Sequence, residues 1–256
     1  MHRVGAALSA WWREAWISVE ARLSGTPPIE ASVASPLGLS EPNDFPAADH
    51  IRLNRRVGPR QPGQPDIYPE YAGGWNGVAY RFFECAQNDV AFRTWFARGG
   101  PSPVIDLRYR QETHLFYFFV AGLASIESFS YMAYALAAFI DPANFPLVTP
   151  AQKRAITPAL TVSKYNIGFP GDKVTLALDA VIASQEFIEW SAIRNVLAHR
   201  ISPARAFLAG GPQHGTALWM GLGTLDAATT RDRRAWLAAK LTDLVEATAD
   251  FADARL

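Results

Sequence analysis

The sequence predicts an all-α protein that folds as an antiparallel helical bundle, with an N-terminal helical extension and a long Pro-rich irregular arm. In several long stretches, apolar residues recur at three- and four-residue spacing, which is the period of a helix buried on one face. Apolar side chains make up 49% of the 256 residues, enough for a sizeable core. The pattern shows neither convincing alternating strands nor a repeat of solenoid length.

Composition narrows the classes of function. The 24 Lys and Arg residues balance the 24 Asp and Glu residues, so nothing global indicates a general nucleic-acid or membrane binder. The single cysteine, Cys85, excludes an internal disulfide framework and suits a reducing cytoplasm. The five histidines show no zinc spacing, so we expect no metal and no cofactor. Near the N-terminus, Arg13 and Glu14 interrupt the apolar run that a secretory signal needs, which also favours a cytoplasmic protein.

Residues 1–100 are expected to pack, as helices and an arm, on a bundle formed by residues 101–256. A first amphipathic helix is expected over residues 4–24. Half of the 18 prolines then lie between Pro27 and Pro69, where no helical or strand period survives. Residues 26–72 are therefore expected to form an extended arm or a long loop on the surface.

The densest basic cluster of the chain lies within this arm. Arg52, Arg55 and Arg56 belong to it, and such a cluster is one way to contact the phosphates of RNA. A solvated loop is the simpler interpretation of the same residues. Both interpretations remain open from the sequence.

Two long helices are expected next, over residues 76–97 and residues 106–140. From Leu115 to Ile140 the only charged residue is Glu127, and this run is long enough to span a membrane. A charge in the middle of a span would be costly, and hydroxyl side chains are scattered around it. We therefore expect no membrane span, and predict instead the central helix of a soluble bundle.

Glu127 then needs an explanation, because a carboxylate on a central helix requires a partner. One possibility is that it meets Arg194 or His199 from a neighbouring helix. The other is that it reaches solvent, or accepts hydrogen bonds from nearby hydroxyl and backbone groups.

The last third of the chain is expected to hold short helices, a connection and a closing helix. Thr149-Pro150 and Thr157-Pro158 each have the pattern of an N-cap followed by proline at the first helical position. A helix capped by Asp172 is expected over residues 173–199. Residues 203–225 are predicted to be a Gly-rich connection with Trp219 and Met220 as docking residues.

The closing helix is expected over residues 228–254. Its first turns carry Arg231, Arg233 and Arg234, and cations there oppose the helix dipole. A bound anion or a partner would account for them, although a solvated first turn is the more common arrangement.

A polar segment at residues 194–200 interrupts the helix expected over 173–199. Arg194, Asn195, His199 and Arg200 fall within seven residues of a pattern that otherwise indicates core. Asn195 and His199 are four apart and share one line of a helix. Arg194-Asn195-x-x-x-His199, placed after a long apolar helix and before a closing helix, resembles the Arg-x(4–6)-His signature of the HEPN superfamily. The resemblance covers roughly residues 105–254.

This resemblance implies an HEPN-like helical bundle and a metal-independent endoribonuclease that dimerises, often as a toxin or an effector of phage defence. His199 would exchange the protons of the 2′-hydroxyl and the 5′-oxygen, because imidazole titrates near neutrality. Arg194 would hold the scissile phosphate, and Asn195 would orient the imidazole or bind a phosphate oxygen. Glu127 and Arg200 are supporting candidates.

The resemblance also leaves a second function open, because HEPN-like domains include non-catalytic modules that bind a protein or a nucleotide. Arg, Asn and His near the end of a helix also cap its last carbonyls without any catalysis. The neutral charge of the chain argues against a general RNA binder. A narrow substrate such as tRNA, or a sequestering partner such as an antitoxin, would reconcile the neutral charge with ribonuclease activity.

Overall fold

The computed structural model describes residues 33–34, 40–199, 205–208, 216–219 and 223–256. The chain divides into two compact units, Met1–Glu30 and Ala31–Leu256, and every described element belongs to the second. The helix expected over residues 4–24 lies outside the described residues.

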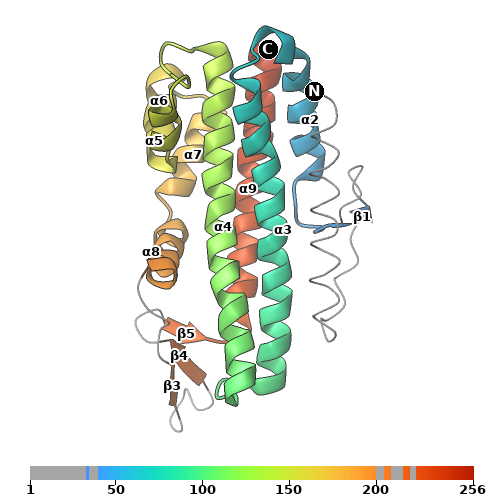
Figure 1. Cartoon of the computed structure of the whole chain (residues 1–256), viewed down its shortest axis with the longest axis vertical. Helices are drawn as coiled ribbons and strands as arrows, with labels where there is room; N and C mark the ends of the chain where they lie inside the picture. Colours follow the sequence, from blue (N-terminus) through green and yellow to red (C-terminus); the bar gives the residue numbers. More distant parts are fainter. Residues whose placement is uncertain (1–32, 35–39, 200–204, 209–215, 220–222) are drawn as a thin grey trace. The chain divides into compact units, whose positions relative to one another are not determined.

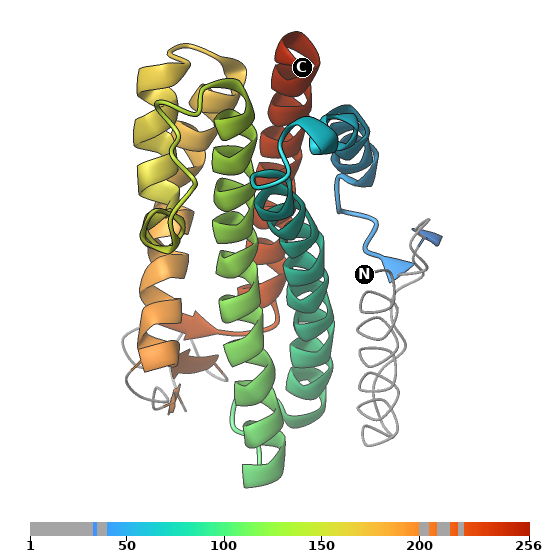
Figure 2. The same cartoon turned by 45° about the horizontal axis from the view of Figure 1, so that its top comes forward.

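The second unit is built on a long helical hairpin. It consists of α3 (Tyr68–Gly99) and α4 (Ile105–Ile140), which run antiparallel and pack along their length (Figure 1). The last helix, α9 (Ala228–Arg255), packs against both (Figures 1 and 2). The unit is mostly helical, which confirms the all-α prediction, and the long helices expected over residues 76–97, 106–140 and 228–254 are present.

Glycines allow the two helices of the hairpin to approach closely. A Cβ added at Gly74 would lie 2.9 Å from the backbone of Met132, and one added at Gly77 would lie 2.8 Å from the hydroxyl of Ser128. Both glycines lie inside α3. This helix begins at Tyr68, eight residues before the expected start at residue 76. The contact with α4 outweighs the low helix propensity of glycine.

The irregular arm expected over residues 26–72 is wrong for its second half. Residues Ala47–Val57 form α2, and a 3₁₀ helix follows over Gly58–Gly63. His50, Leu53 and Val57 are buried on one face of α2, which packs against α9 (Figure 2). The prolines lie before and after this helix and not within it. In the first half of the arm, β1 (Val33–Ala34) pairs with β2 (Ser40–Glu41).

The division expected between residues 100 and 101 falls in the turn between α3 and α4. Both helices belong to the same compact unit.

A reciprocal pair of hydrogen bonds joins α2 to α3. The His50 Nε2–H group donates to the carbonyl of Trp75 at 2.9 Å, and the Trp75 Nε1–H group donates to the carbonyl of His50 at 2.8 Å. The two rings are stacked with their centroids 4.2 Å apart. Burial lowers the pKa of His50 to about 4, although its bond to the Trp75 carbonyl acts the other way. The imidazole is therefore neutral in the folded protein near pH 7.

Acidification is expected to destabilise the protein through His50. In the unfolded chain the imidazole takes up a proton near pH 6.5, but in the folded protein only near pH 4. Between these values the unfolded state binds more protons, so the free energy of unfolding should fall by about 3 kcal/mol as the pH is lowered. Urea unfolding at several pH values would measure this. In the His50→Gln variant, the free energy of unfolding should fall much less across that pH window than it does in the wild type. An equal fall in the two proteins would contradict the assignment.

Four shorter helices flank α4 on one side of the hairpin. They are α5 (Pro150–Ala155), α6 (Pro158–Gly168), α7 (Lys173–Ile182) and α8 (Gln185–His199). Thr149 and Thr157 cap α5 and α6 as predicted, and Thr149 forms a capping box with Gln152. Asp172 occupies the N-cap position of α7, but its carboxylate makes no cap bond there. It accepts a hydrogen bond from Arg255 instead.

The single helix expected over residues 173–199 is broken into α7 and α8. The break lies at Ala183 and Ser184, where the Ser184 hydroxyl accepts from the backbone N–H of Phe187 at 3.3 Å. Serine is a strong N-cap, so a new helix begins there. The break gives α8 its own direction, and it packs on the middle of α4 (Figure 1).

A small sheet replaces the irregular connection expected over residues 203–225. The strands are β3 (Arg205–Leu208), β4 (Thr216–Trp219) and β5 (Gly223–Leu225), and they pair antiparallel in the order β3-β4-β5. Trp219 docks as predicted, because it is buried with its ring 5.8 Å from that of Phe119. Met220 lies outside the described residues.

Among the described helices, α4 alone is long and apolar enough to cross a membrane. In its most apolar window, 78% of the residues are buried inside the protein. Such burial is typical of the core helix of a soluble protein.

Candidate functional site

A pocket of about 230 Å³ lies between α4, the start of α6, the end of α7, and α8. The break between α7 and α8 lets α8 present one polar edge to α4. The lining includes three residues that the sequence singled out, Glu127, Arg194 and Asn195. The others are Leu123, Thr157, Pro158, Ala159, Ile182, Phe187 and Ser191.

An ion pair crosses this pocket from α8 to α4. The Arg194 Nη2 group donates a hydrogen bond to Glu127 Oε1. The side chains of Arg194 and Glu127 are 24% and 41% exposed, so the pair is half-buried. Of the partners considered for Glu127 from the sequence, Arg194 is the one observed.

The neighbours of Arg194 on α8 continue the polar edge. Ser191 and Asn195 are four residues apart and share one line of the helix, and both face the pocket. His199 is the last residue of α8 and follows Asn195 by four, but its side chain lies outside the described part of the structure. Arg200 lies wholly outside it. The structure therefore brings Arg194, Asn195 and Glu127 together and leaves the imidazole undescribed.

The first turn of α6 forms the wall of the pocket beside this edge. The Thr157 hydroxyl accepts from the Leu160 N–H at 3.2 Å, and Pro158 has no N–H to satisfy. The start of a helix carries a partial positive charge, which adds to that of the Arg194 guanidinium. An anionic group that displaced Glu127 would find a cation, a carboxamide and hydroxyl groups there. The donor set suits a phosphate oxygen.

The described residues contain no group of three or more His, Cys, Asp or Glu side chains placed to hold a metal ion.

The three arm arginines lie elsewhere, on α2. Arg52 bonds to Asp49 at 2.8 Å, to Asp253 at 3.0 Å and also to Asp250, while Arg56 lies 3.9 Å from Asp253. A separate open groove of about 430 Å³ is lined by Ala48, Arg52, Arg55, Arg56 and Asp253. Carboxylates of α9 therefore offset much of the charge of this cluster. Their sequence separation of about 200 residues from Arg52 hid this pairing.

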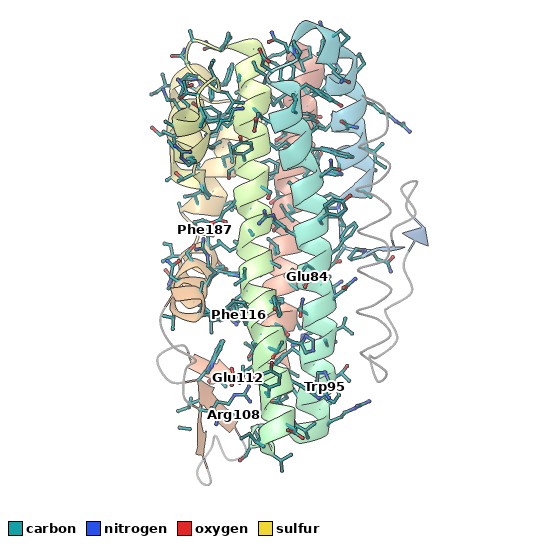
Figure 3. The ribbon with its side chains drawn as sticks, viewed as in Figure 1. Glu84, Trp95, Arg108, Glu112, Phe116 and Phe187 are labelled. Carbon is teal, nitrogen blue, oxygen red and sulfur yellow. The ribbon has the colours of Figure 1, made fainter. Side chains whose placement is uncertain are left out.

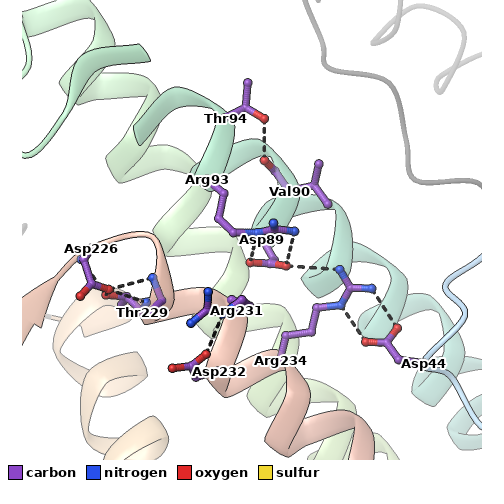
Figure 4. Close-up of polar contacts among 11 residues, drawn as sticks. Asp44, Asp89, Val90, Arg93, Thr94, Asp226, Thr229, Arg231, Asp232 and Arg234 are labelled. Atoms are coloured by element: carbon purple, nitrogen blue, oxygen red, sulfur yellow. Dashed lines mark hydrogen bonds and ion pairs between the residues drawn. The ribbon is translucent and has the colours of Figure 1, made fainter. Parts of the chain in front are cut away.

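A buried charge network at the start of α9 was also missed. Arg234 donates to both carboxylate oxygens of Asp44 at 2.9 Å and to Asp89 at 3.2 Å, and Asp89 also accepts from Arg93 (Figure 4). Asp89 is only 1% exposed. Arg234 therefore forms ion pairs inside the protein and does not point to solvent as a binding group. The exposed Arg231 pairs with Asp232 (Figure 4), and Arg233 donates to the carbonyl of Thr229.

Comparison with models of protein families, with characterised proteins and with solved structures finds no match.

Proposed function

We propose that this protein is a metal-independent endoribonuclease of the HEPN type, with the pocket between α4 and α8 as its phosphate-binding site. The observation that carries the proposal is that Arg194 and Asn195, from the Arg-x(4)-His segment, line one pocket together with Glu127. The helical hairpin and the closing helix agree with the resemblance in architecture.

The proposed reaction needs only side chains of the segment. His199 accepts the proton of a ribose 2′-hydroxyl, whose oxygen attacks the adjacent phosphorus. The bond from phosphorus to the 5′-oxygen breaks, and the protonated His199 returns its proton to that oxygen, which yields a 2′,3′-cyclic phosphate and a 5′-hydroxyl. Arg194 offsets the charge that develops on the phosphate, and Asn195 orients the imidazole or a phosphate oxygen. Glu127 holds the guanidinium in place before the substrate arrives.

In this proposal the protein is a cytoplasmic homodimer whose two segments share one cleft. Its activity is that of a toxin or a defence effector, held in check by an antitoxin or another protein partner. The substrate is a restricted RNA such as tRNA, because the net charge of the chain is zero.

One observation favours a second candidate, a non-catalytic HEPN-like module that binds a protein or a nucleotide. Arg194 is already engaged by Glu127 in the free protein. An arginine held by an internal carboxylate serves a structural role equally well. The two candidates differ in whether RNA is cut.

The test uses labelled RNA, including tRNA, incubated with purified protein in EDTA at neutral pH. His199→Ala should lower the cleavage rate by about 10²–10⁴-fold, because the acid–base group is lost. Arg194→Ala should also lower it strongly. The matched control is Arg231→Ala, which removes an exposed arginine of α9 and should leave the rate unchanged.

Three outcomes decide between the candidates. Cleavage that survives His199→Ala would exclude the proposed chemistry. Absence of cleavage with every RNA, together with saturable binding of a nucleotide or a partner, would establish the non-catalytic module. A 2′,3′-cyclic phosphate on the product would support the ribonuclease.

A further inference from the structure

The turn end of the α3–α4 hairpin carries two arginines held on one indole ring. The Arg98 Cζ atom lies 4.8 Å from the centroid of the Trp95 ring, and the Arg110 Cζ atom lies 4.5 Å from it. Both arginine side chains are exposed, and within the described part of the chain neither forms an ion pair. The ring thus fixes two cations whose charge is not neutralised.

A line of side chains continues from this pair along α4. Arg110, His114 and Tyr117 are spaced by four and three residues, so they share one face of the helix over about 10 Å. Tyr117 is 49% exposed. We call the surface formed by Trp95, Arg98, Arg110, His114 and Tyr117 the hairpin strip.

His114 is held in one orientation within the strip. Asn88 on α3 donates its amide hydrogens to Glu84, so its Oδ1 atom faces His114 Nδ1 at 2.8 Å. The Nδ1–H group is therefore the donor, and Nε2 carries the lone pair of a neutral ring. Burial, and then the charge of Arg110, lowers the pKa of His114.

Acidic residues do not cancel the charge of the strip. Glu84 is engaged by Asn88, and Asp106 is an exposed carboxylate at the turn end. Glu112 points to the other flank of α4, where it accepts from Arg205 at 2.6 Å and lies 3.9 Å from Arg108 (Figure 3). The hairpin end therefore has an excess of cations.

We propose that the hairpin strip binds single-stranded RNA. Arg98 and Arg110 contact two backbone phosphates, and the exposed ring of Tyr117 stacks on a base. A fixed pair of guanidinium groups, with an exposed aromatic ring about two helical turns away, can bind the phosphates and a base of a single strand with little regard to sequence. The inference builds on the proposed ribonuclease, since the strip holds RNA away from the pocket where it is cut.

The binding test uses His199→Ala protein, so that the RNA stays intact, and a fluorescein-labelled oligouridylate of 15 nucleotides. Arg98→Gln/Arg110→Gln should weaken binding about tenfold at 0.1 M salt and make the salt dependence shallower by about 1.4 in log–log slope. The matched control is Arg60→Gln/Arg154→Gln, which removes two exposed arginines from outside the hairpin strip. It should change the dissociation constant less than twofold.

A second pair of variants tests stacking. Tyr117→Ala should weaken binding about fivefold or more, because a base loses its aromatic partner. Tyr109→Ala removes a more exposed tyrosine, 72% accessible, from another face of α4 and should have little effect. Circular dichroism of each variant would verify that the fold is retained.

Several outcomes overturn the inference. They are no binding of the oligouridylate, equal weakening by the two double variants, or equal effects of the two tyrosine variants. Polyglutamate that binds as tightly and depends on the same arginines would identify an acidic protein partner instead. Cleavage by the wild type is scored separately. RNA binding without cleavage would refute the ribonuclease alone, and cleavage with unchanged binding by the hairpin variants would refute the strip alone.

Discussion

Replacing Arg234 by methionine is expected to lower the free energy of unfolding by about 3 kcal/mol. The substitution keeps the apolar stem but removes three hydrogen bonds that join α9 to Asp44 and Asp89 (Figure 4). Asp89 is 1% exposed and would keep its ion pair with Arg93 but lose the one with Arg234. Breaking a buried pair costs more than the pair contributes, because one charge is left in the interior.

Urea unfolding followed by circular dichroism would measure this effect. The matched control is Arg231→Met, three residues earlier on the same helix. Arg231 and its partner Asp232 are 61% and 66% exposed, so the control should change stability by less than about 0.5 kcal/mol. Similar urea midpoints for the two variants would show that the buried network contributes no more to stability than an exposed ion pair does.

Replacing Gly122 by alanine is expected to destabilise the protein by about 2–3 kcal/mol. An added Cβ would lie 2.1 Å from the indole of Trp190, which must then move. That indole is 1% exposed, stacks on Phe118 with ring centroids 5.2 Å apart, and donates to the carbonyl of Phe119 at 2.8 Å. Helix propensity acts in the opposite direction and is smaller.

Gly73→Ala is the matched control for this substitution. Nothing lies within 4 Å of a Cβ built at Gly73, so this change should stabilise α3 by about 0.5–1 kcal/mol. Because Trp190 lies one turn before Arg194 on α8, Gly122→Ala should also reduce RNA cleavage if the proposed function is correct. Equal stability of the two alanine variants would contradict the close contact between α4 and α8.

The long helices could be predicted because their signal is local. The end of α4 at Asp141-Pro142 and the caps at Thr149 and Thr157 are determined by residues that are adjacent in the sequence. Helix α2 was missed because the prolines around it dominated the pattern. The small sheet was missed because its strands of three or four residues are too short to show a period.

The candidate site could be predicted in part for a related reason. Glu127 stood out as the one charge in an apolar run, so a partner for it was an obvious question, and Arg194 was among the few options. Arg52 and Arg234 offered no such clue. Apart from Asp49, their carboxylate partners come from segments about 150 to 200 residues away, and only the packing of α9 brings them together.

The packing of α9 has a consequence for the order of synthesis. Helices α3 and α4 are consecutive, so their hairpin can form as soon as both have left the ribosome. The partners that α9 supplies to Asp89 on the hairpin and to Arg52 on α2 become available only after α9 has been synthesised. A nascent chain that stops before residue 228 therefore exposes an apolar seam beside a buried carboxylate that still lacks Arg234. Chaperones and proteases can recognise such a chain by its exposed apolar surface.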